Sequence, residues 1–195
     1  MKKKNGILFL LSLMLTSNLF AQGQDKKNII GFGAGISPKY DYAVWIGEPV
    51  NVWVTKNTSP VFQLFYARQM NQALRLGGYF EYESATMKFF STGDSKTSRL
   101  NIGINWLSQF PNRPFHMQLG GYIGYGSVSA SDWSQSLYGS DVGIMLGPAY
   151  EKNNFGIALH VQYGKGYYGN YKSTGTPNEV GLSIPRFILK VYHKF

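Results

Sequence analysis

Two glutamates and two arginines are the residues of this chain best suited to chemistry. Glu81 and Glu83 lie two positions apart, so on a β-strand both carboxylates would point to the same side. Two neighbouring carboxylates can divide the roles of general acid and general base. Arg75 and Arg99 lie close by in the sequence, and a nearby guanidinium would keep both carboxylates ionised. We therefore expect ion pairs at these positions rather than acid–base catalysis.

The sequence context argues against a functional role for other motifs that resemble binding or catalytic sites. Residues Gly164 to Gly169 read GKGYYG, which matches the dinucleotide fingerprint GxGxxG, but no helical pattern follows and a flexible aromatic-rich loop is expected. No histidine and carboxylate are spaced to share a metal ion. The chain has no cysteine, which excludes disulfides, zinc–thiolate sites and thiol catalysis. We predict no catalytic residue, no cofactor and no metal, and hence no enzyme.

The N-terminal residues predict export from the cytoplasm. Three lysines at positions 2–4 precede an apolar run from Ile7 to Leu15, and Ala21 offers a small residue for cleavage. The run is shorter than the roughly 20 residues that a membrane-spanning helix needs. We therefore expect a signal peptide over residues 1–21 and one mature domain over residues 22–195.

Charge favours lipid over nucleic acid as a partner. The formal net charge is +9, and loss of three lysines with the signal peptide leaves about +6 (9 − 3). These charges form no basic run, so no nucleic-acid surface is expected. Contact with anionic lipid headgroups or lipopolysaccharide is the expected use of the excess.

Period-2 patterns predict the elements that position these residues. In residues 98–107, Leu100, Ile102 and Ile104 share one face of a strand, while Arg99 and Asn101 lie on the other. The same alternation of apolar with polar or small residues marks seven further segments, at residues 28–37, 60–69, 73–89, 115–126, 141–151, 155–164 and 180–195. Short polar connections at 70–72, 109–114 and 152–154 alternate with mostly longer ones at 39–59, 91–96, 129–140 and 165–179. Eight antiparallel strands are therefore expected.

The final strand carries the strongest signal. Phe187, Leu189 and Val191 alternate with charged or polar residues up to the terminal Phe195. In this pattern the chain resembles the small OmpA/OmpX-type outer-membrane barrels of Gram-negative bacteria, although His193 stands where that family usually has an apolar or aromatic residue. The resemblance implies an all-β fold, an eight-stranded antiparallel up-and-down transmembrane β-barrel in the cell outer membrane. It also implies that Phe187, Leu189, Val191 and Phe195 form the signal for the barrel insertion machinery.

Two alternatives follow from the same barrel. A soluble lipocalin-type barrel would point the apolar face inward, but its charged and glycine-rich other face suits solvent poorly. Some outer-membrane barrels are lipid A deacylases with an exposed serine, histidine and acid. Here parity places His116 and His160 inside, and His193 at the wrong end for that chemistry.

In an eight-stranded barrel the inward face forms a lumen that side chains nearly fill. We predict a lumen charge network of six residues: Arg75, Glu81, Glu83, Arg99, Arg186 and Lys190. The first three would pair with Arg99 of the next strand, and Arg186 and Lys190 with acids across the lumen. The network either plugs the pore or lines a narrow ion path. Glu81→Gln with Glu83→Gln should lower the urea midpoint if the network stabilises the barrel.

The predicted loops are the expected working surface. Exposed aromatics there are either anchors for a protein or glycan, or residues at the lipid headgroups. The candidates are Trp45, Trp53, Trp133, Tyr167, Tyr168 and Tyr171. Residues 50–54 alternate, so the first loop could form a hairpin whose edge pairs with a partner's sheet. Outward Pro148 could mark a strand bulge or a contact site. We expect a non-enzymatic barrel for envelope integrity or surface interaction, or else an accessory subunit of an outer-membrane secretion or assembly complex.

Overall fold

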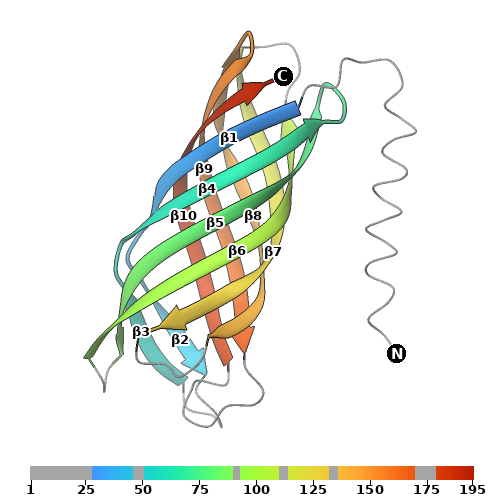
Figure 1. Cartoon of the computed structure of the whole chain (residues 1–195). Coiled ribbons are helices and arrows are strands. Elements are labelled where there is room, and N and C mark those ends of the chain that lie inside the picture. The colour runs from blue at the N-terminus through green and yellow to red at the C-terminus, as the bar shows by residue number, and fades with distance from the viewer. Residues whose placement is uncertain (1–27, 46–50, 90–92, 110–113, 132–135, 170–178) are drawn as a thin grey trace, which may run out of the picture.

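Ten strands make up a closed antiparallel barrel in the computed structural model (Figure 1). The structure describes residues 28–45, 51–89, 93–109, 114–131, 136–169 and 179–195, and the predicted signal peptide lies outside them. The strands are β1 (Asn28–Ser37), β2 (Tyr40–Trp45), β3 (Asn51–Lys56), β4 (Ser59–Gln69), β5 (Leu74–Phe89), β6 (Gly93–Gln109), β7 (Phe115–Ala130), β8 (Leu137–Lys152), β9 (Phe155–Gly169) and β10 (Glu179–Lys194).

Eight of these strands close the wall, as predicted. Going round the barrel, β1 pairs with β4, then β5 to β10 follow in order, and β10 pairs with β1. Strands β2 and β3 prolong β1 and β4 beyond a short break. Ser37 lies opposite Ser59, and the same register continues with Tyr40 opposite Lys56. The first predicted loop is therefore mostly a two-stranded hairpin that lengthens the wall at the end opposite the C-terminus (Figure 1).

Two prolines explain the break between β1 and β2. Pro38 directly follows β1, and the pairing of β1 with β10 ends at Ile36 opposite Phe187, two residues from Pro185. Neither proline can donate a ladder hydrogen bond. The Ser37 hydroxyl donates instead to the carbonyl of Pro185 at 2.9 Å. The predicted hairpin is present, and its outer edges are partly paired with neighbouring strands. Trp45 pairs with Glu179 of β10, and the end of β3 pairs with β5.

Burial is inverted relative to a soluble protein, which excludes the lipocalin-type alternative. Large apolar side chains on the outer face are well exposed, including Ile102 at 61% and Ile144 at 63%. Inward neighbours such as Glu81, at 0%, are completely buried. An apolar exterior that surrounds a polar interior is the arrangement that a lipid bilayer requires of a β-barrel. Among the described residues no helix has the length and apolar character to cross a membrane.

Outward aromatics mark the two edges of the apolar belt. Phe115 and Tyr125 of β7 are 64% and 63% exposed, and Phe155 of β9 is 65% exposed. Strands β6 to β9 continue beyond the predicted ends, on the side of the hairpin. The sequence prediction stopped where the outer apolar pattern stops, but pairing continues past the belt because the ladder does not depend on lipid contact.

Glycines make room for large aromatic side chains inside the barrel. Tyr122 of β7 is buried, and a Cβ at Gly143 or Gly164 would overlap its ring or hydroxyl. Gly143 and Gly164 lie opposite each other on β8 and β9. The Tyr122 side chain therefore packs directly on the backbone of both strands. This contact gives the first glycine of the GKGYYG segment a packing role, on a strand rather than in the predicted loop.

The outer wall has one irregularity, at Pro148. Pairing between β8 and β9 stops after Leu146 opposite Val161 and resumes at Ala149 opposite Ala158. The proline lacks the N–H that the ladder needs, so the local gap follows from its chemistry. The gap skips two residues on each strand, so it is not the predicted bulge, and a contact site at Pro148 stays a prediction.

Candidate functional site: a charged plug in the lumen

All six residues of the predicted charge network point into the barrel and are at most 5% exposed: Arg75, Glu81, Glu83, Arg99, Arg186 and Lys190. They come from β5, β6 and β10, whose period-2 alternation turns the charged positions inward. Burial alone would be costly for an ion, so the partners of each charge decide what the group can do.

Arg99 is the centre of one layer of ion pairs, which lies on the side of the hairpin. Its guanidinium forms ion pairs with Glu81, with Glu83 at 3.4 Å and with Asp141 at 2.6 Å. Three acids from two strands therefore converge on one planar cation, which can donate five hydrogen bonds in fixed directions. The hydroxyl of buried Tyr168 lies 3.5 Å from the same guanidinium.

Arg186 of β10 reaches the same acids from across the lumen. Its guanidinium lies 2.7 Å from a carboxylate oxygen of Glu81 and 3.8 Å from Asp141. Asn101 adds an amide donor, 2.6 Å from Asp141. A pairing between strands as distant as β5 and β10 can form only through the interior, so these contacts fill the lumen from wall to wall.

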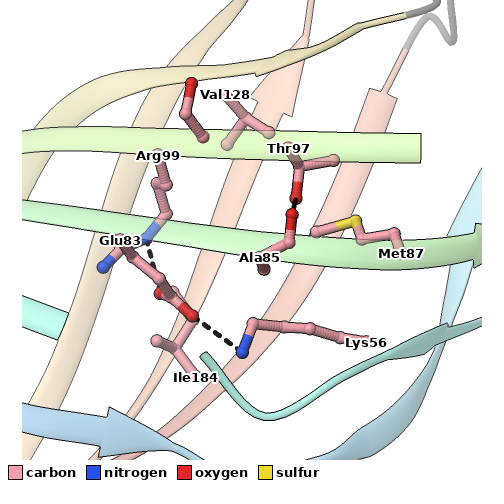
Figure 2. Close-up of a pocket in the computed structure, with 9 residues that line it drawn as sticks. Lys56, Glu83, Ala85, Met87, Thr97, Arg99, Val128 and Ile184 are labelled. Atoms are coloured by element: carbon pink, nitrogen blue, oxygen red, sulfur yellow. Dashed lines mark hydrogen bonds and ion pairs between the residues drawn. The ribbon is translucent and has the colours of Figure 1, made fainter. Parts of the chain in front are cut away.

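Lys56 closes this layer toward the hairpin. Its ammonium lies 2.7 Å from Glu83 (Figure 2). It also donates to the Ser59 hydroxyl, which donates to Glu83 at 2.7 Å. A cavity of about 10 Å³ lies beside Arg99 and Ile184, which is room for about one water molecule. The layer contains three cations and three acids, so its formal charges balance: Lys56, Arg99 and Arg186 against Glu81, Glu83 and Asp141.

A second layer of ion pairs lies at the end of the barrel that carries the C-terminus. Glu151 of β8 accepts a hydrogen bond from the Tyr192 hydroxyl at 2.5 Å, and it forms ion pairs with Arg75 at 2.5 Å and with Lys194. The prediction that Arg75 joins the group around Arg99 is therefore wrong. Arg75 lies near the start of β5, at the end of the barrel that carries the C-terminus. Its side chain can therefore reach only an acid at that end.

Lys190 also departs from the prediction, which paired it with an acid across the lumen. Its ammonium is 2% exposed, has no hydrogen-bond partner among the described residues, and lies 5.1 Å from the centre of the Phe65 ring. The contact is a cation–π interaction, with the ammonium between the two ionic layers.

Replacing Lys190 with methionine should leave the free energy of unfolding unchanged or raise it. A buried cation without an acid costs desolvation free energy, and an apolar chain of similar length removes that cost. Urea unfolding of the refolded barrel in detergent measures the change. A loss of more than about 1 kcal/mol would mean that the ammonium makes a favourable interaction beyond the Phe65 ring.

The histidines are placed as predicted, with His116 and His160 inside. The His160 Nε2 lies 2.8 Å from the Gln118 side-chain oxygen, and the Gln118 amide lies 3.3 Å from His116. His116 in turn approaches Glu151 at 3.8 Å. These partners are an amide and a carboxylate, which build a polar link from wall to wall rather than an activated hydroxyl. The described residues contain no group of three or more potential metal ligands.

The predicted loop contacts divide into three groups. Tyr167 is 60% exposed, whereas Tyr168 is 1% exposed and faces the lumen, so its prediction as a surface contact is wrong. It lies on strand β9, where alternate residues must face opposite sides. Trp45 and Trp53 belong to strands β2 and β3 of the hairpin. Trp133 and Tyr171 lie outside the described residues.

The C-terminal strand turns its apolar residues toward lipid. Phe187, Leu189, Val191 and Phe195 are all between 44% and 58% exposed. His193, the departure from the expected pattern, lies between two aromatic rings, 4.8 Å from Phe155 and 6.4 Å from Phe195 by centroid. The imidazole therefore contributes a flat ring to this stack. A role of these residues in insertion stays a prediction.

Four charged residues of the plug were not part of the predicted network: Lys56, Asp141, Glu151 and Lys194. Asp141 and Glu151 lie on the polar face of the alternating segment 141–151, so counting every inward acid would have found both. Lys56 was hidden because residues 39–59 read as a loop, in which side-chain direction has no period.

No family model and no curated protein matches the chain. Several solved structures do match the chain. Neisserial surface protein A is 16% identical, with 88% of this chain and 100% of that chain covered at a TM-score of 0.53. The E. coli outer membrane protein W is 11% identical, covers 89% and 100%, and has a TM-score of 0.54. The outer membrane protein AlkL is 14% identical, covers 90% and 92%, and has a TM-score of 0.52.

At these identities the likeness shows the fold alone. It agrees with the closed strand order, the exposed apolar belt and the buried polar lumen, each of which follows from the residues themselves. The chain therefore has the fold of these small outer-membrane β-barrels.

Proposed function

We propose that this protein is a sealed, non-enzymatic barrel that acts through its outer surfaces, in the integrity of the outer membrane or in contacts at the cell surface. The observation that carries the proposal is the balanced ionic layer around Arg99. It links β3, β5, β6, β8 and β10 through the lumen and leaves a cavity of about 10 Å³ beside it. A hydrated ion or a small nutrient needs a continuous polar path, which these ion pairs occupy.

A strain that lacks the protein tests this proposal. We expect the strain to become more sensitive to detergent and to large antibiotics, while its uptake of small nutrients stays unchanged. Complementation with the wild-type chain should restore the barrier. Unchanged sensitivity together with a loss of uptake of a small solute would contradict the proposal and favour a narrow path through the lumen.

The hairpin supports a second candidate, an accessory subunit of an outer-membrane complex. Strands β2 and β3 form a two-stranded ribbon at this end of the wall (Figure 1). Among the described residues they pair with neighbouring strands only at Trp45 and over the end of β3, so the remaining ladder positions on their outer edges are available to a strand of a partner. A mild-detergent pull-down from isolated outer membranes should compare the wild type with a variant whose residues 41–53 are replaced by a tight turn, which keeps Lys56 of the ionic layer. A stoichiometric partner held only by the wild type would favour this candidate, and a lone monomer in both would exclude it.

A further inference from the structure

A groove of about 210 Å³ indents the outer wall where β8, β9 and β10 meet. Its apolar lining consists of Tyr150, Phe155, Ile157 and Val191, all of which face outward and are between 43% and 65% exposed. Lys152 completes the lining at one end. The register explains the shape, since Ile157 lies opposite both Tyr150 and Val191, so its branched side chain forms a floor between neighbouring strands.

The groove lies at the edge of the apolar belt on the side of the C-terminus. Lys152 is the last residue of β8 and lies opposite Phe155, the first residue of β9. The Phe155 ring packs against the tilted ring of His193, which supports one wall of the groove. Aromatic residues at the edge of the apolar belt mark the depth in the membrane at which acyl chains meet headgroups. This end carries the short turns that face the periplasm in barrels of this type.

A basic residue, Lys152, lies at one end of this groove. The neighbouring acid, Glu151, points inward, where it is engaged by Arg75, Lys194 and the Tyr192 hydroxyl. Lys152 is exposed on the outer side. Its ammonium therefore faces the headgroup layer beside an apolar groove, and the nearest carboxylate in the sequence is committed to the lumen.

We propose that this groove binds one anionic glycerophospholipid from the periplasmic leaflet of the membrane. An acyl chain lies along Ile157 and Val191, between the rings of Tyr150 and Phe155, and the phosphate lies at the Lys152 ammonium. A basic residue at the membrane surface attracts an anionic lipid by about 1 kcal/mol, so Lys152 gives the site its preference for negative headgroups. The site is independent of the lumen and of the function proposed above.

Native mass spectrometry of the full mature barrel tests the proposal, with dioleoyl phosphatidylglycerol and dioleoyl phosphatidylcholine added in turn. The wild type should retain one phosphatidylglycerol, with about a fivefold preference over phosphatidylcholine. Lys152→Gln should remove the preference, and Lys152→Arg should keep it. Ile157→Trp should lower the retention of both lipids by filling the groove.

Arg68 provides a matched control. It is an exposed basic residue near the same end of β4, four positions away from β8 in either direction round the eight-stranded wall. Arg68→Gln should bind lipid like the wild type, and a heat-induced shift in gel mobility shows that each variant has folded.

Three results would overturn the proposal. The first is equal retention of the two lipids by the wild type, and the second is an equal loss in Lys152→Gln and Arg68→Gln. The third is a lipid-free dimer that Ile157→Trp dissociates, which would assign the groove to a second copy of the chain.

Discussion

Replacing Arg99 with methionine should lower the free energy of unfolding by about 3–5 kcal/mol, as expected when one partner of a buried ion-pair network is removed. Arg99 is 5% exposed and neutralises Glu81, Glu83 and Asp141. Without it, three buried carboxylates share only two other cations, and the cost of their desolvation is no longer offset. Urea titration of the refolded barrel, followed by tryptophan fluorescence, measures the loss.

Arg68→Met is the matched control for this variant. It removes the same side chain from an exposed position on the outside of β4, where a substitution is expected to change stability by no more than about 0.5 kcal/mol. Equal midpoints for Arg99→Met and the wild type would show that the network contributes nothing to stability.

The acidic half of the network gives the reciprocal result. Glu81→Gln with Glu83→Gln should also lower the urea midpoint, because Arg99 and Arg186 then keep only Asp141 as an ionic partner. Combining this pair with Arg99→Met should destabilise the barrel by less than the sum of the two changes, since fewer unpaired charges remain. Strict additivity would mean that the three residues do not act as one network.

Replacing Gly164 with valine should cost about 3 kcal/mol through overpacking. A side chain at this position would overlap the Tyr122 hydroxyl and the backbone of Val142. Tyr122 is 2% exposed and also covers Gly143, so it has no room to withdraw. Thermal unfolding in detergent and the heat-induced shift in gel mobility both report the loss.

Gly78→Val separates packing from backbone effects. Gly78 lies on β5, and the nearest atom that a Cβ would meet is the carbonyl oxygen of Gly103 at 3.6 Å, an ordinary contact. A β-branched residue on an open strand position is neutral or favourable. If both substitutions were equally harmful, the cause would be the loss of glycine itself rather than contact with Tyr122.

The strand pattern could be predicted from sequence because it follows from local chemistry. Lipid on one side and a narrow lumen on the other force an alternation that is visible in residues such as Leu100, Ile102 and Arg99. The same alternation placed the predicted charges inside. Tyr168 was misread because the apolar signal on β9 ends before the strand does, and the tyrosine continues the inward set.

Ion-pair partners could not be predicted in the same way. Arg75 and Glu81 lie on one strand, yet Arg75 pairs with Glu151 and Glu81 pairs with Arg186. These choices depend on how far each strand is shifted along its neighbour and on which walls face each other across the lumen. Such shifts accumulate round the barrel, so no local pattern encodes them. The hydrogen bond from Ser37 to Pro185 has the same origin, since these two residues are far apart in sequence and meet only after the barrel closes.

Single-channel recording from the purified barrel in a planar lipid bilayer tests the central claim most directly. If the ionic layer around Arg99 seals the lumen, the wild type will insert without producing steps of current in 1 M salt at moderate voltage. Stable, ion-selective current steps from the wild-type protein would contradict a sealed barrel. If replacing Glu81 and Glu83 by glutamine also weakened or reversed the ion selectivity of these steps, the same charges would line a conducting path.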